Sequence, residues 1–433
     1  MNYEEAVSYI EEIPKFTKMH PLEHVRDFIK RLGEPGLKKR VIHVAGTNGK
    51  GSVCVYVKAI LEAEGRRTGL FTSPHLLKLN ERICICGTDI SDEEFMAVFA
   101  RAKEVAGAME KEGAGHPSYF EFLFGMAMQA FERADIEYVI LETGLGGRLD
   151  ATNVVEKPLI TIITSIGFDH TAVLGETIGA IAAEKAGIVK PGVPLICDGN
   201  NEQALTVIKA KAKRSGCWCR EIAKNAFEIR EIMDKDIAFS IRSAYYEDIV
   251  WKLRGTGIYQ PMNAVLALEA MRYLSKQEKF CESLQEWAAA LALVNWPGRM
   301  EEVLPGVIVD GGHNTEAVKE VVAGIRKQKK NRPRIILYAA VGDKNYVEAA
   351  GFLGNHAEAD MIVTTRLADS RGVEAEELAA IFRNSTSCQV TAKEQVKEAF
   401  HYALDQKGKD GILYCLGSLY LVGEIKAVLG EEL

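Results

Sequence analysis

The chain has 433 residues, of which 47% are hydrophobic and 26% charged, and its formal net charge is −7 at pH 7. A single hydrophobic core stops growing near about 250–300 residues, so two domains are expected. The acidic balance argues against a surface for nucleic-acid phosphates, because such a surface requires a basic excess. The sequence therefore predicts an ordinary globular protein without a nucleic-acid partner.

The first residues, MNYEEAVSYIEEI, are acidic and amphipathic, whereas a signal peptide begins with basic residues and a short apolar run. No stretch reaches the roughly 18–20 apolar residues of a membrane helix. The nine cysteines form no CxxC pair, which predicts reduced, mostly buried thiols rather than a zinc or redox motif. A cytoplasmic protein with no membrane partner is expected.

Short β-branched runs alternate with helical patterns from Val41 onward, which predicts βαβ units around a mostly parallel sheet. Between residues 225 and 253 the pattern changes to period-two alternation, which predicts a small antiparallel insertion at the end of the first domain. A second βα alternation follows Pro297 and predicts a smaller, Rossmann-like α/β domain. The main strands are expected at residues 41–46, 138–144, 159–167, 193–199, 307–312, 334–342, 361–366 and 412–418.

Proline and glycine at positions 297 and 298 interrupt two long patterned regions. We therefore expect an N-terminal domain of residues 1–296 and a C-terminal domain of residues 297–433, both of the α/β class. The interruption is typical of a hinge between domains, and it is equally typical of an ordinary turn.

A glycine-rich loop joins the first predicted strand to a helical pattern. Glycines let backbone N–H groups turn toward an anion, the helix dipole favours negative charge, and a lysine adds a mobile cation. The generic pattern GxxxxGK[ST] is not met, because Val44 stands at its first glycine and a glycine separates the lysine from the serine. A glycine-rich turn with an incidental lysine is the alternative. The loop begins with Gly46 and Thr47. Its sequence predicts nucleotide binding by Asn48, Gly49, Lys50, Gly51 and Ser52.

A second motif follows another predicted strand. Glu142 stands at the carboxyl end of that strand, before the glycine-rich run TGLGGRLDATN. In open parallel sheets, ligands bind at this edge. By itself, an acidic residue before such a run is also typical of a structural turn.

Together, the two loops resemble the paired signatures of the folylpolyglutamate synthase and dihydrofolate synthase family, within the Mur ligase superfamily. The resemblance continues through the whole chain in six further motifs. They are Thr72-Ser73-Pro74-His75-Leu76, Asp169-His170, Ala183-Glu184-Lys185-Ala186-Gly187-Ile188, Trp296-Pro297-Gly298-Arg299, Asp310-Gly311-Gly312-His313-Asn314 and Gly417-Ser418-Leu419-Tyr420.

The resemblance implies ATP and two Mg²⁺ ions as cofactors. In the family the lysine that matches Lys185 is carbamylated by carbon dioxide, whereas its helical segment alone would indicate a salt-bridged surface. A histidine such as His170, taken alone, is more often a satisfied polar residue than a magnesium ligand. The implied metal-binding residues are Ser73, Glu142, His170 and Lys185, and the implied catalytic residues are Lys50, Lys185, His170 and Arg299.

The resemblance also implies contacts from a C-terminal domain that closes over the nucleotide. Asn263, Arg299 and Asp310 are implied to contact ATP, although Asn263 is equally typical of a helix N-cap. His313 and Ser418 match positions near the incoming glutamate, and each is equally typical of a loop or cap residue.

For the pterin, the resemblance points to the loop before Leu22 and to an aromatic side chain at Phe120. Phe120 can stack on a flat heterocycle, but at helical spacing with Phe124 it is also typical of a core residue. The implied substrate residues are Leu22, Phe120, Leu149, Asp150, Ala151, His313 and Ser418.

The implied reaction joins L-glutamate to dihydropteroate or to the terminal glutamate of a folate through an acyl phosphate, in a monomeric enzyme. The sequence leaves open whether both acids are used. A peptidoglycan Mur ligase is one alternative, but too few residues precede Gly46 for a UDP-binding domain. A phosphate-loop NTPase acting as a switch is the other, and it predicts no acid-dependent ADP release.

Overall fold

The computed structural model describes residues 1–14, 20–233, 235–247, 249–328, 332–342 and 345–432. Contacts divide the chain into two compact units. The first unit contains residues 1–167, 171–226 and 262–291, and the second contains residues 168–170, 227–261 and 292–433. The expected boundary between residues 296 and 297 stays a prediction. Within the described residues, no helix is both long and apolar enough to cross a membrane.

The first unit is built on an eight-stranded sheet in the order β4-β3-β2-β5-β1-β6-β7-β8. All pairs are parallel except β2 with β3 and β3 with β4, so the mostly parallel sheet expected from the sequence is confirmed. The strands are β1 (Arg40–Ala45), β2 (Thr68–Phe71), β3 (Ile83–Ile85), β4 (Thr88–Asp89), β5 (Tyr138–Glu142), β6 (Ile160–Ile163), β7 (Leu195–Asp198) and β8 (Cys219–Ile222).

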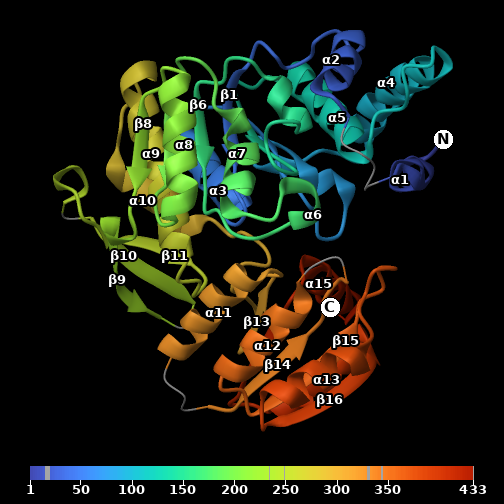
Figure 1. The fold of residues 1–433 in the computed structure, drawn as a ribbon, viewed down its shortest axis with the longest axis vertical. Helices are drawn as coiled ribbons and strands as arrows, with labels where there is room; N and C mark the ends of the chain where they lie inside the picture. Colours follow the sequence, from blue (N-terminus) through green and yellow to red (C-terminus); the bar gives the residue numbers. More distant parts are fainter. Residues whose placement is uncertain (15–19, 234, 248, 329–331, 343–344, 433) are drawn as a thin grey trace. The chain divides into compact units, whose positions relative to one another are not determined.

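Helices cover both faces of this sheet (Figure 1). They are α1 (Tyr3–Glu12), α2 (Leu22–Arg31), α3 (Lys50–Ala63), α4 (Asp92–Lys111), α5 (Tyr119–Arg133), α6 (Thr171–Leu174), α7 (Ile178–Lys185), α8 (Glu202–Arg214), α9 (Gln260–Glu278) and α10 (Leu284–Leu293). Short 3₁₀ turns are η1 (Leu79–Arg82), η2 (Ala151–Val154), η3 (Ala186–Ile188) and η4 (Lys224–Ala226).

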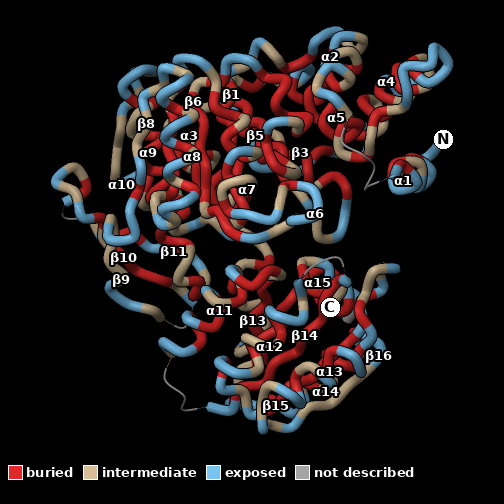
Figure 2. Tube along the Cα trace, in the orientation of Figure 1, coloured by how far each residue is buried: buried red, intermediate tan, exposed pale blue. Residues whose placement is uncertain are grey.

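The register of the strands shows which helices share a face. Val41, Val139 and Phe71 point to one face, where α1, α2, α4 and α5 pack on them. On the same face, Ile163 and Leu195 contact α7 and α8. The opposite face is covered by α3, which contacts β1, β2 and β5, and by α9. The central strands β1, β5 and β6 are consequently buried almost throughout, as Figure 2 shows.

The second unit contains a six-stranded sheet in the order β12-β13-β17-β14-β15-β16, parallel except for β12. The strands are β12 (Glu301–Leu304), β13 (Val307–Asp310), β14 (Arg334–Tyr338), β15 (Met361–Arg366), β16 (Gln389–Gln395) and β17 (Ile412–Leu416). Its helices are α11 (Thr315–Lys327), α12 (Tyr346–His356), α13 (Ala375–Ser385), α14 (Val396–Lys407) and α15 (Leu419–Glu432). One apolar cluster joins α11, α12 and α13 to the sheet, while α14 and α15 contact other strand residues.

The expected antiparallel insertion is confirmed as a three-stranded sheet of β9 (Phe227–Ile232), β10 (Asp236–Ile241) and β11 (Trp251–Arg254), with the 3₁₀ turn η5 (Ala244–Tyr246). Its residues group with the second unit. Two contacts explain this grouping: Lys235 forms an ion pair with Glu302 at 3.0 Å, and a Cβ at Gly255 would lie 3.0 Å from the carbonyl oxygen of Met300.

Candidate active site

The phosphate loop joins β1, in the middle of the first sheet, to the N-terminus of α3. Gly49 precedes the first helical residue with φ +88, a left-handed conformation that favours glycine. Gly46 passes so close to β6 that a Cβ there would lie 1.8 Å from the Thr164 hydroxyl oxygen. Both glycines are therefore required by the backbone path that brings the chain to the helix N-terminus.

Three consecutive carbonyl oxygens of this loop accept hydrogen bonds from side chains of the chain itself. The Lys185 amine donates to Gly46 O at 2.7 Å, and the Lys50 amine donates to Thr47 O at 3.2 Å. The hydroxyl of Thr164 donates to Asn48 O at 2.7 Å, as does that of Ser165 at 3.2 Å. These bonds fix the conformation of the loop.

Two buried hydroxyl groups at this edge of the sheet have no hydrogen-bond partner within the described part of the chain. They are Ser52 Oγ, in the first turn of α3, and Thr143 Oγ1, directly after β5. Buried polar groups are normally hydrogen-bonded. Ser52, a predicted nucleotide contact, thus has an unused group where a phosphate or its metal ion would lie. Thr143 was not predicted, and its place after Glu142 is the only sequence signal for it.

The predicted metal residues Ser73 and Glu142 lie together. The Ser73 backbone N–H donates to Glu142 Oε2 at 3.0 Å, because β2 and β5 are neighbours that end at the same edge. Glu142 is only 4% exposed. Burial raises the pKa of the nearby Cys54 thiol, Glu142 raises it further, and Lys50 acts in the opposite direction. The Glu142 carboxylate and the Lys50 amine therefore both act on the part of α3 that contains Cys54.

Lys185 ends α7 and is 4% exposed, with its amine against the phosphate loop at Gly46. Close glycine packing holds this segment. A Cβ at Gly147 would lie 2.7 Å from Lys185 O, and one at Gly187 would lie 2.3 Å from Arg148 Cα. Gly147 and Gly187 thus place Lys185 beside the loop, a function that sequence reasoning did not assign to them.

Asn263 lies against the phosphate loop from α9. A Cβ at Gly49 would approach Asn263 Oδ1 to 2.2 Å, and Asn263 is 6% exposed. Since α9 begins at Gln260, Asn263 is inside the helix, and the alternative of an N-cap is wrong. The structure thus brings together Asn48, Gly49, Lys50, Gly51, Ser52 and Asn263.

A buried hydrogen-bond chain runs from β1 to the loop after Glu142. His43 Nε2 lies 2.8 Å from Thr152 Oγ1, which donates to Asp150 Oδ1 at 2.5 Å, so His43 Nε2 donates to Thr152. The second oxygen of Asp150 accepts from the N–H groups of Gly144 and Leu145, each at 2.9 Å. Burial raises the pKa of Asp150 despite these donors. The chain fixes the loop that contains the predicted pterin residues.

His43 should make the protein less stable in acid. Burial lowers its pKa to about 3, and Lys190 adds to the shift. As the pH falls, the unfolded chain, with a histidine pKa near 6.5, binds a proton before the folded protein does. The contribution of neutral His43 to the free energy of unfolding is therefore present above pH 6.5 and is lost as the pH falls toward 3. Between pH 7 and pH 5, wild type should lose about 2 kcal/mol of unfolding free energy more than His43→Gln.

Urea unfolding of both proteins at the two pH values measures this difference. His356→Gln, at an exposed position in the second unit, should behave as wild type. Equal pH dependence in His43→Gln and wild type would contradict the assignment.

Three of the predicted pterin residues gather on the face that carries α2 and α5. Leu22 and Phe120 pack on the cluster that contains Ala151, and the Phe120 ring lies 5.5 Å from that of Phe71. A Cβ at Gly144 would lie 2.6 Å from the Phe120 ring, which places Phe120 over the loop that Asp150 holds. Leu149 is half-buried in that loop. Of the predicted loop before Leu22, residues 15–19 lie outside the described residues.

In the second unit, Asp310 ends β13 and lies beside Arg299. Its carboxylate accepts from Tyr259 Oη at 2.5 Å and from the N–H groups of Met300 at 2.9 Å and Gly312 at 2.7 Å. Burial raises its pKa, and Arg299 opposes this shift. These bonds give Asp310 a structural function, and its predicted contact with the nucleotide stays a prediction, as does that of Arg299.

Asp169 brings His170 and His313 together within the second unit. His170 Nε2 lies 3.8 Å from Asp169 Oδ1, and His313 Nε2 lies 3.6 Å from Asp169 Oδ2. Ser418 precedes α15 and accepts from the N–H of Tyr420 at 3.1 Å, as a cap residue does. Because His170 belongs to the second unit and Ser73, Glu142 and Lys185 to the first, a shared metal site stays a prediction.

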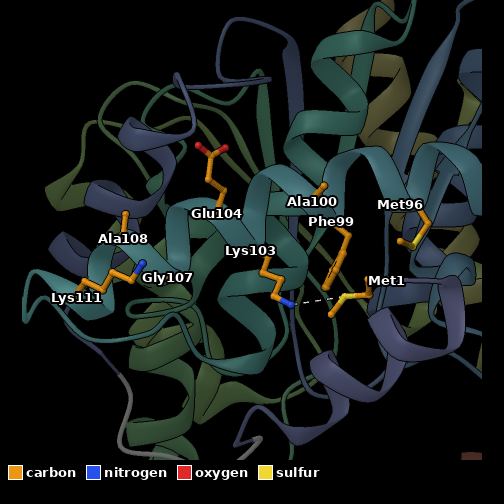
Figure 3. Close-up of a pocket in the computed structure, with 9 residues that line it drawn as sticks. All are labelled: Met1, Met96, Phe99, Ala100, Lys103, Glu104, Gly107, Ala108 and Lys111. Atoms are coloured by element: carbon orange, nitrogen blue, oxygen red, sulfur yellow. Dashed lines mark hydrogen bonds between the residues drawn. The ribbon is translucent and has the colours of Figure 1, made fainter.

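A surface hollow of about 750 Å³ lies elsewhere in the first unit, along α4 (Figure 3). The Lys103 amine lies across it, 3.6 Å from Met1 Sδ. None of the predicted site residues lines it, so it is separate from the candidate site. Its lining is Met1, Met96, Phe99, Ala100, Lys103, Glu104, Gly107, Ala108 and Lys111.

Two family models match the chain in order. Residues 44–271 match the Mur ligase middle domain, and residues 298–419 match the Mur ligase glutamate ligase domain. With the phosphate loop between β1 and α3, these matches make the chain a Mur ligase-type protein.

Individual relatives define the branch. The chain is 34% identical to the dihydrofolate synthase/folylpolyglutamate synthase of Bacillus subtilis, over 98% of both chains. It is 30% identical to the folylpolyglutamate synthase of Lacticaseibacillus casei over 81% of this chain and 82% of the relative. The structure of E. coli FolC in complex with DHPP and ADP has a TM-score of 0.85 and 28% identity, covering 100% of this chain and 98% of that one. The chain belongs to the dihydrofolate synthase/folylpolyglutamate synthase family.

Proposed function

We propose that this chain is an ATP-dependent ligase that joins L-glutamate to the carboxylate of dihydropteroate, to the terminal glutamate of a folate, or to both, and releases ADP and phosphate. One arrangement supports the chemistry: the phosphate loop, the Glu142–Ser73 pair and Lys185 meet at one edge of a parallel sheet. The full-length match to the Bacillus subtilis relative supports the folate substrates over a peptidoglycan precursor.

ATP binds through the phosphate loop in this proposal. Asn48, Gly49 and Gly51 provide backbone N–H groups at the N-terminus of α3, where the helix dipole favours anions. The Lys50 amine exchanges Thr47 O for the outer phosphates, and Asn263 contacts the nucleotide from α9. The buried hydroxyl of Ser52 gains the partner that it lacks among the described residues.

The buried carboxylate at this edge of the sheet supports a proposed site for two magnesium ions. Mg²⁺ prefers oxygen ligands, and Glu142 offers a buried carboxylate beside Ser73. We assign Ser73, Glu142, His170 and a carbamylated Lys185 to metal binding. When bound, magnesium neutralises phosphate charge and orients the oxygens around the transferred group.

The reaction then has two steps. An oxygen of the acid's carboxylate attacks the γ-phosphorus of ATP, and the bond from that phosphorus to ADP breaks, which gives an acyl phosphate. The neutral amine of L-glutamate attacks the acyl carbon, and its nitrogen then loses one N–H proton. The tetrahedral intermediate expels phosphate and leaves an amide. Lys50 offsets the charge on the outer phosphates in the first step.

The acid binds where α2, α5 and η2 meet. Phe120 offers its ring to the flat pterin, and Leu22 and Ala151 add apolar atoms from the same cluster. We assign Leu149, half-buried in the neighbouring loop, to the same substrate. Asp150 acts by holding the loop, since both of its oxygens already accept hydrogen bonds from the chain.

From the second unit, we propose that Arg299 and Asp310 contact the nucleotide and that His313 and Ser418 contact the incoming glutamate. The family match over residues 298–419 supports these assignments. A hinge near Pro297 and closure of the C-terminal domain stay predictions. We further propose that the protein acts as a monomer in the cytoplasm.

The acceptor test decides between the folate function and its alternatives. ADP release with ATP, Mg²⁺ and L-glutamate should require dihydropteroate or tetrahydrofolate, and each acid is tested alone to show whether one or both are used. A UDP-muramyl acid should give no more ADP than a reaction without acid. Release that is independent of acid, or that only the UDP-muramyl acid stimulates, would contradict the proposal.

A further inference from the structure

His20, His24 and Glu121 bring two imidazoles and a carboxylate together in the first unit. His20 and His24 lie on either side of the start of α2, while Glu121 is in the first turn of α5. Helices α2 and α5 contact each other, so residues a hundred positions apart in sequence become neighbours. Neither histidine was singled out from the sequence.

The distances between their ligand atoms are those of a compact metal site. His20 Nδ1 lies 2.9 Å from Glu121 Oε2, and His24 Nδ1 lies 3.5 Å from the same oxygen. One ligand atom from each of the three residues lies within 4.8 Å of the other two. In the described ranges, no other three residues among His, Cys, Asp and Glu meet this condition. Around a tetrahedral zinc ion, ligand atoms at about 2.0–2.1 Å from the metal lie about 3.3 Å apart.

Burial gives a second, independent observation. Neither ring nitrogen of His24 forms a hydrogen bond with the described residues, although both atoms are buried. The Glu121 side chain is 8% exposed, and its Oε2 accepts from the Ser118 N–H at 2.8 Å. A simple pair between His20 and Glu121 accounts for His20. It leaves His24 Nδ1 at 3.5 Å from Glu121 Oε2 without a hydrogen bond, and His24 Nε2 with no hydrogen bond to the described residues. A metal ion at the common point would bind His24 Nδ1.

We propose that His20, His24 and Glu121 form a binding site for one divalent transition-metal ion of the zinc class. Two imidazole nitrogens with one carboxylate suit zinc, whereas magnesium and calcium prefer sites made mostly of oxygen atoms. Three protein ligands leave a fourth position open to water or another small ligand. The site is separate from the Glu142–Ser73 pair. Its residues are sequence neighbours of Leu22 and Phe120, which we assign to the acid, but the zinc titration below does not use the ligase reaction.

Zinc titration of the purified, chelator-treated full-length protein tests the proposal. It is done against a chromophoric chelator, with excess Mg²⁺ to fill oxygen-rich sites. Wild type should bind one equivalent more than His24→Ala or His20→Ala, or at least about tenfold more tightly. Cysteine thiols contribute equally to all these proteins, so the difference reports the histidines. Glu121→Gln should also weaken binding, while its amide can still serve the capping box at Ser118.

The control variant is His356→Ala, which removes an exposed histidine from the second unit and should bind zinc as wild type does. Zinc should also raise the melting temperature of wild type but not that of His24→Ala, which shows that the ion binds the folded protein. Equal zinc uptake by wild type, His20→Ala and His24→Ala would overturn the proposal, as would displacement of the zinc by Mg²⁺.

Discussion

Lys50→Ala should lower the rate of ADP release by about 10²–10³-fold, the effect of removing one preorganised charge-stabilising donor from a transition state. Lys50 is the first residue of α3, and its amine lies 3.2 Å from Thr47 O, within the loop that receives the phosphates. The lysine is half-buried and makes one side-chain hydrogen bond to the described residues, so its loss should leave folding intact. ADP release with saturating acid, L-glutamate and Mg²⁺ measures the effect, and circular dichroism checks the fold.

Lys58→Ala is the matched control for Lys50→Ala. Lys58 lies on the same helix and pairs with Glu62 at 3.1 Å, so this variant removes the same charge from another place. Its turnover should stay near that of wild type. Full turnover in Lys50→Ala, or an equal loss in both variants, would refute the assigned function of Lys50.

Lys185→Ala should also reduce turnover by at least about a hundredfold. The proposed carbamate forms when the neutral amine attacks carbon dioxide, so that a C–N bond forms and the nitrogen loses a proton. The product is an anion whose oxygen atoms are ligands suited to Mg²⁺. Lys185 is buried at Gly46 O, beside the loop, which is where such an anion would be needed. Acetate or formate added to Lys185→Ala should restore part of the lost activity.

Lys190 supplies the control for the carbamate. Its amine donates to Asn153 O at 3.0 Å, and burial lowers its pKa to about 8, so Lys190 is partly unprotonated near neutral pH. Native mass spectrometry in bicarbonate should find the carbon dioxide adduct in wild type and in Lys190→Ala but not in Lys185→Ala. An adduct that persists in Lys185→Ala, or is absent from wild type, would show that Lys185 is not carbamylated.

Strands with β-branched runs were predictable because burial on both faces leaves a continuous apolar signal. The runs at 41–46 and 361–366 became β1 and β15 within a few residues. Six strands within the described residues were not expected, namely β2, β3, β4, β8, β12 and β16, and two of them have clear physical reasons. The sequence of β2 is only TGLF, whose glycine packs against Phe131. Strand β16 is a polar edge strand, QVTAKEQ, in which no residue is buried.

The candidate site was predictable as far as strand ends define it. Ser73 follows β2 and Glu142 is the last residue of β5, and these two strands are neighbours. The position of Glu142 at the sheet edge could therefore be predicted from its place at a strand end. The contact between Lys185 and Gly46 spans 139 positions, and the His20–Glu121 contact spans 101. Such contacts depend on how helices pack, which no local pattern in a single sequence encodes.

The hydrogen bonds to the carbonyl oxygens of Gly46 and Asn48 have a thermodynamic consequence. Fixing the backbone of one residue costs about 1–2 kcal/mol at 25 °C, so a loop that became ordered only with its ligand would lose much of the intrinsic affinity. In this chain that entropy is lost during folding, before nucleotide arrives. Nucleotide affinity should therefore stay nearly constant among variants of the α2–α5–η2 region, which can diverge in acid preference independently of the loop.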